Sequence, residues 1–100
     1  MIVVSHMTKA DLIIKISEKL NLQARQTETV VNLIFDMMGD TLKNDDRIEI
    51  RGFGTFANRV YGSYTARNPK TGAPVKVEPK RVPFFKVGKA LREMVDSKKV

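Results

Sequence analysis

The sequence predicts an α+β fold in which helices flank a long, basic β-hairpin. Apolar residues recur at helical spacing between residues 9 and 43, and apolar and charged residues alternate at residues 47–51. Residues 52–86 follow, with seven Lys and Arg residues, one acid and all four prolines. A chain of 100 residues is expected to form one domain.

The first helix is predicted at residues 9–20. Thr8 stands before it and Asp11 follows three residues later, which is the spacing of a capping box with Asp in place of Glu. Its apolar face consists of Leu12, Ile13, Ile16 and Leu20.

The second helix is predicted at residues 24–43. Its apolar face consists of Val30, Leu33, Ile34, Met37, Met38 and Leu42. Phe35 widens this face beyond what one short helix could cover. Asn44 is expected to end the helix in the left-handed conformation, which Asn adopts where Gly is absent.

A strand is predicted at residues 47–51, because Ile48 and Ile50 alternate with charged residues. Both isoleucines are expected to point inward. Residues 52–54, Gly-Phe-Gly, are expected to form a tight turn, and the next strand begins near Thr55.

The hairpin is predicted to turn at residues 67–72, Arg-Asn-Pro-Lys-Thr-Gly, and to return to about Phe85. Three prolines on the returning strand cannot donate hydrogen bonds in a sheet. They are therefore expected at sheet edges or strand ends: Pro74, Pro79 and Pro83.

The remaining segments set the domain boundaries. A last helix is predicted at residues 89–95. Residues 1–6 are interpreted as an N-terminal extension or a cloning remnant, because they are too short for a signal peptide. The domain then spans residues 7–97, with its arm at about 57–83, and residues 98–100 form a basic C-terminal tail.

The net charge of +7 is unevenly distributed along the chain. Residues 7–46 carry a net charge of −2, whereas residues 57–86 carry +6. Such asymmetry indicates a polyanionic partner, either nucleic acid or an anionic membrane surface. No apolar run approaches the roughly 18 residues of a spanning helix, and the basic region has no helical pattern. No membrane partner is therefore expected.

Side chains suited to catalysis or metal binding are scarce. The chain has no Cys and a single His, His6, in the predicted extension. Asp45 and Asp46 form a carboxylate pair, but they follow a helix, where capping and solvation explain them. We therefore expect no enzyme activity, no cofactor and no metal site.

The predicted core is too small for the aromatic residues that the chain carries. An isolated hairpin is marginal in water, and the remaining body of about 70 residues supports only a thin core. Two chains sharing one core would use the surplus, so we expect an obligate dimer. The candidate dimer core consists of Phe35, Phe53, Phe56, Phe84 and Phe85.

Three motifs resemble the bacterial HU and integration host factor family of histone-like DNA-bending proteins. They are GFGTF at residues 52–56, RNPKTG at residues 67–72 and VPFFKVGK at residues 82–89. The similarity covers residues 7 to about 97. It implies an intertwined dimer with a helical base, a small antiparallel sheet and two long β-hairpin arms that embrace double-stranded DNA.

The resemblance also implies roles for individual residues. In the family, the proline at the arm tip inserts between base pairs in the minor groove and kinks the duplex; here that residue is Pro69, flanked by Arg67 and Asn68. The other basic residues of this region are expected to hold phosphates: Arg59, Lys70, Lys76, Lys80, Arg81, Lys86 and Lys89. The protein would bend and compact DNA in the cytoplasm, at the bacterial nucleoid.

Residues 47–52 resemble the β chain of integration host factor. In that subunit, the arginine before Gly-Phe-Gly enters the minor groove, and the glutamate two residues earlier helps to hold it. The matching residues are Arg51 and Glu49, and Gly52 would let DNA approach closely. A surface ion pair of Glu49 with Arg47 or Arg51 is the alternative.

Other positions are similar to HU, so the subfamily stays open: Thr55 and Val87. Ala66 replaces the glycine that commonly precedes Arg-Asn-Pro in the family. A homodimer and a heterodimer with a related chain are both compatible with the sequence.

Two other kinds of nucleic-acid binding fit the sequence less well. A single-stranded DNA or RNA binding module would use Tyr61 and Tyr64 as stacking platforms, but the chain lacks a regular series of aromatic residues. A helix-turn-helix repressor would use the first two helices, whose net negative charge does not suit a recognition helix.

Overall fold

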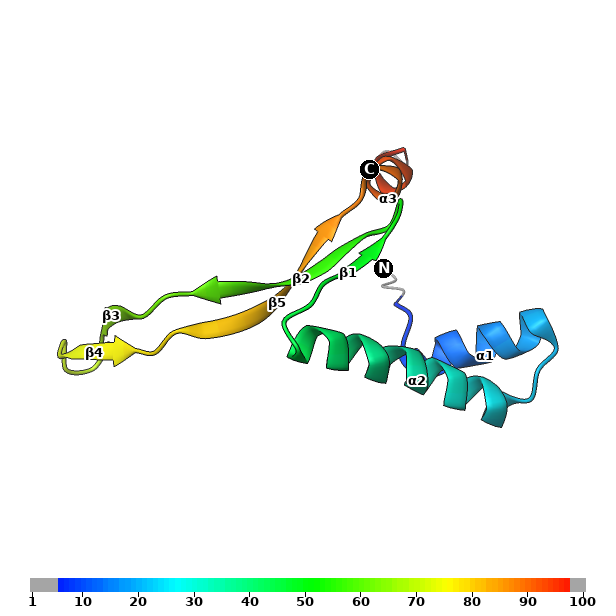
Figure 1. The fold of residues 1–100 in the computed structure, drawn as a ribbon, viewed down its shortest axis with the longest axis horizontal. Coiled ribbons are helices and arrows are strands. Elements are labelled where there is room, and N and C mark those ends of the chain that lie inside the picture. The colour runs from blue at the N-terminus through cyan, green and yellow to red at the C-terminus, as the bar shows by residue number, and fades with distance from the viewer. Residues whose placement is uncertain (1–5, 98–100) are drawn as a thin grey trace, which may run out of the picture. The chain divides into compact units, whose positions relative to one another are not determined.

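The computed structural model describes the chain from His6 to Ser97 and divides it into two compact units. The first unit reaches Gly39 and the second begins at Asp40. Helices and antiparallel strands both occur (Figure 1), which confirms the predicted α+β class. The predicted basic tail at residues 98–100 and the first five residues of the predicted extension lie outside the described part.

The first unit contains α1 (Lys9–Leu20) and most of α2 (Ala24–Lys43), and both helices have the predicted bounds. The capping box at the start of α1 is confirmed. The backbone N–H of Asp11 donates to Thr8 Oγ1 at 3.1 Å, and the backbone N–H of Thr8 donates to Asp11 Oδ2 at 3.0 Å. Two of the orphan N–H groups at this helix end are therefore paired.

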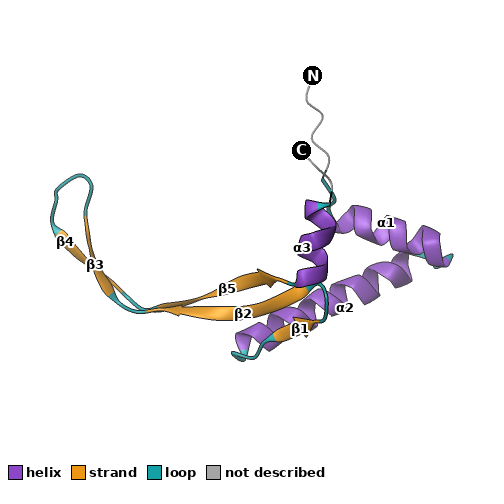
Figure 2. Ribbon diagram, turned by 90° about the horizontal axis from the view of Figure 1, so that it is seen from above, coloured by secondary structure: helices purple, strands orange, loops and turns teal. Residues whose placement is uncertain are grey.

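The two helices lie side by side (Figure 2), and Lys9 Nζ donates a hydrogen bond of 2.8 Å to Asn32 Oδ1. Among the described residues, Val31 is the only buried hydrophobic side chain and Thr27 the only buried polar one, and both belong to α2. The Thr27 hydroxyl donates to the Gln23 carbonyl at 3.0 Å. A single chain thus buries very little of the apolar surface predicted for its helices.

The end of α2 differs from the prediction by one residue. Asp45, and not Asn44, adopts the left-handed conformation, with φ of 61°. The N–H of Asp45 donates to the carbonyl of Leu42, and the N–H of Asp46 donates to that of Thr41, each at 3.0 Å. This pair of bonds is a Schellman motif, which places its left-handed residue at Asp45.

The strands of the second unit form a long hairpin with a short additional strand (Figure 1). A three-stranded antiparallel sheet has the order β1 (Ile48–Ile50), β2 (Gly54–Tyr61) and β5 (Lys80–Val87). The hairpin continues as a two-stranded ladder of β3 (Tyr64–Arg67) and β4 (Pro74–Val77). We call the ladder of β2 and β5 the root of the arm, and that of β3 and β4 its outer ladder.

The root and the outer ladder are separated by an unpaired segment, which we call the joint. Gly62 and Ser63 on one strand stand opposite Glu78 and Pro79 on the other. The same number of residues is skipped on each strand, so both ladders keep one register. Pro79 has no N–H to donate, which helps to explain why pairing stops there.

The other prolines of the returning strand lie where the prediction placed them. Pro74 is the first residue of β4, and Pro83 lies in β5, at an edge of the three-stranded sheet. An edge strand tolerates a residue without an N–H, because one of its sides has no partner strand.

The turn between β1 and β2 is closed by a hydrogen bond of 3.0 Å from the N–H of Phe53 to the carbonyl of Ile50, with Gly52 at a φ of 84°. Gly54 belongs to β2 and not to the turn. Of the two isoleucines expected to point inward, Ile48 is half-buried, but Ile50 is 41% exposed in the single chain. The register places both isoleucines on the face of the sheet that holds Phe56, so the exposure of Ile50 shows how little of that face one chain covers.

Helix α3 (Lys89–Asp96) is attached to this turn. The N–H of Gly88 donates to the Phe53 carbonyl at 2.8 Å, and the N–H of Leu91 donates to the Gly52 carbonyl at 2.9 Å. A Cβ at Gly88 would lie only 3.0 Å from the Gly52 carbonyl oxygen, so this close approach favours glycine. The turn and the start of α3 thus form one structural element.

Candidate nucleic-acid interface

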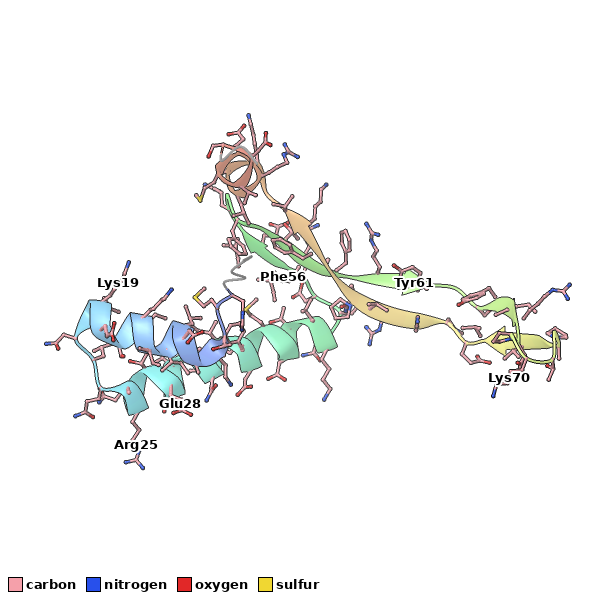
Figure 3. All side chains as sticks on the ribbon, turned by 180° about the vertical axis from the view of Figure 1, so that it is seen from behind. Lys19, Arg25, Glu28, Phe56, Tyr61 and Lys70 are labelled. Carbon is pink, nitrogen blue, oxygen red and sulfur yellow. The ribbon has the colours of Figure 1, made fainter. Side chains whose placement is uncertain are left out.

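The root of the arm has one basic face. Side chains alternate between the two faces of a ladder, and the register places Arg59, Lys80 and Lys86 on the same face. Tyr61 shares this face and is 45% exposed. Figure 3 shows it midway along the arm. We call this the basic face.

The outer ladder repeats the pattern. Arg67 and Lys76 lie on one of its faces, and the other face is apolar and consists of Tyr64, Ala66, Val75 and Val77. Within each ladder the cations thus lie on one face, with the exception of Arg81 in the root. Arg81 shares the opposite face of the root with Asn58.

Arg59 is held on the basic face by an aromatic ring. Its guanidinium carbon lies 3.5 Å from the centre of the Phe84 ring, within range of a cation–π interaction. The contact orients the guanidinium and leaves its outer face available to an anion.

The tip of the arm is a compact turn around Asn68. Its Oδ1 accepts hydrogen bonds from the N–H groups of Lys70 at 2.8 Å and Thr71 at 3.4 Å, while its carbonyl accepts from the N–H of Gly72 at 2.7 Å. Gly72 has a φ of 71°, a conformation that favours glycine. Pro69 is exposed in this turn, beside Lys70 at the far end of the arm (Figure 3). The predicted wedge therefore has a supported backbone and a free ring.

The residues that resemble the minor-groove site of the integration host factor β chain, Glu49, Arg51 and Gly52, line one hollow. A hollow of about 370 Å³ is lined by Glu49, Ile50, Arg51, Gly52, Gly54, Thr55 and Gly88. Glu49 pairs with Arg47 at 3.0 Å and not with Arg51. Within residues 6–97, the Arg51 guanidinium forms no ion pair, so its charge is available to a ligand. Lys89, next to the hollow in sequence, lies 4.0 Å from Glu93.

A cluster that the sequence analysis missed lies at the root of the arm. Asn58 Nδ2 donates to the carbonyl of Leu42 at 2.7 Å and to Asp45 Oδ1 at 3.2 Å. Arg81 Nη1 lies 3.2 Å from the same Asp45 oxygen. The hydrogen bond from Asn58, followed by the charge of Arg81, lowers the pKa of Asp45 below its usual value of 3.8.

The lowered pKa of Asp45 predicts a pH dependence of stability. A carboxylate whose pKa is lower in the folded state contributes stability above its unfolded pKa and loses it as the pH falls through its folded pKa. We expect the wild type to lose more stability than Asp45→Asn as the pH falls from about 4 into the range below 3.8. Urea midpoints of both proteins across this range measure the difference. Parallel curves would contradict the assignment.

The predicted aromatic residues are distributed over several surfaces. Ring centroids of Phe53 and Phe56 lie 5.6 Å and 4.6 Å from that of Phe85, which makes one cluster. Phe84 lies on the basic face beneath Arg59. Phe35 is 47% exposed on α2. Their joint role in a dimer core stays a prediction.

Neither a metal site nor a membrane-spanning helix is found in the part of the chain that the structure describes. Between residues 6 and 97, no group of three or more His, Cys, Asp or Glu residues is arranged to hold a metal ion. No helix in the same range is long and apolar enough to cross a membrane.

Comparisons with known proteins give consistent results. The family model described as bacterial DNA-binding protein matches residues 7–96. The chain is 48% identical over 92 residues to the integration host factor subunit beta of Shewanella pealeana, covering 91% of this chain and 97% of that protein. The corresponding subunit of Nitrosomonas europaea is also 48% identical over 92 residues, covering 91% and 88%.

Solved structures resemble the chain as well. A cocrystal structure of Anabaena HU with DNA matches with a TM-score of 0.80 and 30% identity, covering 89% of this chain and 97% of that one. An HU mutant from Thermotoga maritima matches with a TM-score of 0.65 and 27% identity, covering 89% and 99%.

Proposed function

The chain belongs to the family of bacterial DNA-binding proteins, and we propose that it is an architectural protein that binds and bends double-stranded DNA. The observation that carries this function is an exposed proline, Pro69, at the tip of an arm whose two ladders each hold their cations, apart from Arg81, on one face. The role is structural and not enzymatic, and its place is the nucleoid in the bacterial cytoplasm.

The working unit is an obligate dimer. The single chain exposes 9195 Å² of surface, whereas a folded monomer of its mass exposes roughly 5,700 Å². The surplus, on the order of 3,500 Å², is ample for the interface of an obligate dimer. It includes apolar side chains that a monomer would leave in water, such as Leu33, Ile34, Phe53 and Met94. Either a second copy or a related chain serves as the partner.

Bending requires both the wedge and the charge. Unstacking a base step costs a few kcal/mol, and smooth bending of a 20–30 base-pair site costs about 1–6 kcal/mol. Pro69 loses little entropy when it inserts, because its φ is fixed and it has no N–H to leave unpaired. The basic face supplies the remaining free energy by neutralising phosphates and releasing counterions. Its cations are Arg59, Lys80 and Lys86, and Arg67 and Lys76 of the outer ladder and Lys70 at the tip add to them.

A bending assay across a salt series tests this function. Duplexes labelled at both ends, either straight or flanked by A-tracts, report bending by FRET and affinity by titration. If about eight phosphates are neutralised per dimer, log K should fall with log salt concentration at a slope near −7. A slope shallower than about −3, or a duplex that binds without bending, would contradict the proposal. Competition with single-stranded DNA and RNA separates this function from stacking on Tyr61 and Tyr64.

Sequence preference is indirect, and Arg51 carries most of it. The minor groove presents a degenerate pattern of hydrogen-bonding groups, so an arginine there responds mainly to groove width and potential. Glu49 lines the same hollow, and the turn at Gly52 brings the backbone close to it. Glu49 tempers the local positive charge through its pair with Arg47.

We expect Arg51→Ala to reduce discrimination between A-tract and mixed-sequence sites by about 5- to 10-fold, with a smaller loss of non-specific affinity. Arg47→Ala is the comparison, because it removes the same charge from the same strand region and leaves Arg51 in place, although it also unpairs Glu49. Measured affinities for both sites at one salt concentration give the ratio. Equal losses for the two variants at both sites would assign Arg51 to phosphate binding alone.

A further inference from the structure

Arg81 differs from every other cation of the two arm ladders, and we propose that it is a positioning residue. With Asp45 and Asn58 it forms a clamp that joins the root of the arm to the last turn of α2. The clamp sets the direction in which the tip of the arm meets DNA. The proposal rests on the proposed function, because DNA bending is what the direction of the arm would control.

The first support is the face on which Arg81 lies. The register pairs Arg81 with Val60, so both are directed away from the face that holds Arg59, Lys80 and Lys86. A phosphate bound along the basic face is therefore on the wrong side of the ladder for Arg81. Charge alone had grouped Arg81 with the phosphate-binding residues, but its position in the strand separates it from them.

The second support is the set of bonds that converge on Asp45. One carboxylate oxygen of Asp45 accepts a hydrogen bond of 3.2 Å from Asn58 Nδ2 and forms an ion pair of 3.2 Å with Arg81 Nη1. Asn58 also donates to the Leu42 carbonyl at 2.7 Å, in the last turn of α2, where carbonyls lack partners within the helix. The clamp thus connects three elements: the helix end, β2 and β5.

The third support is the backbone beneath the clamp. Asp45 is fixed by the Schellman motif and has a φ of 61°, a conformation that Asp and Asn tolerate better than most residues. Asn at this position would keep the backbone and could still accept the hydrogen bond from Asn58. Asp45→Asn therefore removes the charge interaction with Arg81 and little else.

The length of the arm makes a small change at the root matter. From Asn58 to Pro69 the chain extends at most roughly 36 Å, at about 3.3 Å per residue. A rotation of about 10° at the root would move the tip by about 6 Å, which exceeds the 3.4 Å rise between base pairs. If the clamp were loosened, Pro69 would thus insert at more than one base step.

The clamp is not a major source of stability. The side chains of Arg81 and Asp45 are 50% and 58% exposed, and ion pairs at such exposure contribute little to folding. At neutral pH its loss should therefore appear mainly in DNA bending, with only a small change in global unfolding. This separates positioning from a general structural role.

The test compares Asp45→Asn, Arg81→Gln and their double variant with the wild type on a straight duplex and on a duplex that is already kinked. We expect both single variants to reduce bending of the straight duplex to a similar extent, by about 2- to 5-fold in the bent fraction. The double variant should lose no more than either single one. Affinity for the kinked duplex and the salt slope of Arg81→Gln should stay near wild-type values.

A phosphate-binding Arg81 predicts the opposite pattern, and observing it would overturn the clamp. Arg81→Gln would then reduce the magnitude of the salt slope by about 0.9 for each lost phosphate. Asp45→Asn would bind DNA more tightly, because it removes a negative charge. Glu18→Gln is the charge-matched control, since it removes one exposed carboxylate from α1, outside the arm.

A measurement without DNA tests the clamp independently of the proposed function. Amide hydrogen exchange at residues 58–61 and 80–82 should become faster in both single variants and stay unchanged in Glu18→Gln. Unchanged exchange in both single variants would overturn the clamp even if the protein bends DNA. Wild-type protein that leaves the straight duplex unbent would overturn the proposed function, while the exchange data would still judge the clamp.

Discussion

Pro69→Ala is expected to reduce bending of a straight duplex about tenfold while changing affinity for an already kinked duplex by about twofold or less. The ring is exposed at the arm tip, and the turn that carries it is held by Asn68 and Gly72, which the substitution leaves in place. Alanine lacks the flat apolar surface that would replace base stacking. On a straight duplex the free-energy cost of unstacking then remains uncompensated. In a kinked duplex the base step is already unstacked.

The measurement is the FRET change at saturating protein, together with affinities for both duplexes. Pro74→Ala is the matched control, because Pro74 lies on the same arm at the first position of β4, away from the tip. It should bend DNA as the wild type does. Equal losses of affinity on straight and kinked duplexes would show that Pro69 is an ordinary turn residue.

Gly54→Ala is expected to lower the free energy of unfolding by about 2–3 kcal/mol, as is typical of overpacking. A Cβ at Gly54 would lie 2.5 Å from two carbons of the Phe85 ring and 2.6 Å from the Lys86 carbonyl oxygen. The ring cannot retreat freely, because Phe53 and Phe56 pack against it. The backbone carbonyl cannot move without disturbing the pairing of β2 with β5.

Gly62→Ala provides the control for this substitution. A Cβ at Gly62 would meet nothing within 4 Å, so its effect should be within about 0.5 kcal/mol. Urea unfolding at fixed protein concentration measures both variants, because the stability of a dimer depends on concentration. Equal midpoints for the two variants would contradict the packing seen around Phe85.

Local signals were sufficient to predict the helices and the tip of the arm. The bounds of α1 and α2 followed from apolar spacing and, for α1, from the capping box at Thr8. The turn around Pro69 followed from residue types that favour turns. Glu49, Arg51 and Gly52 are neighbours in sequence and line one hollow, and their role in the minor groove stays a prediction.

Features that depend on distant residues were not predicted. The pair of Asp45 with Arg81 joins residues far apart in the sequence, and no local pattern indicates it. Residue preference favours Asn44 as the left-handed residue after α2, whereas the Schellman motif places that residue one position later, at Asp45. The two faces of the arm were available from alternation, but charge alone had grouped Arg81 with the residues of the basic face.

The joint between the two ladders has a consequence for insertions and deletions. Gly62 and Ser63 leave the same gap as Glu78 and Pro79, so the alternation of side chains stays in phase beyond it. One residue added at the joint to a single strand would move the following side chains of that strand to the opposite face, since side chains alternate with a period of two. Arg67 would then turn to the apolar side while Lys76 stayed in place. An insertion that keeps the two faces of the outer ladder must therefore add an even number of residues to a strand.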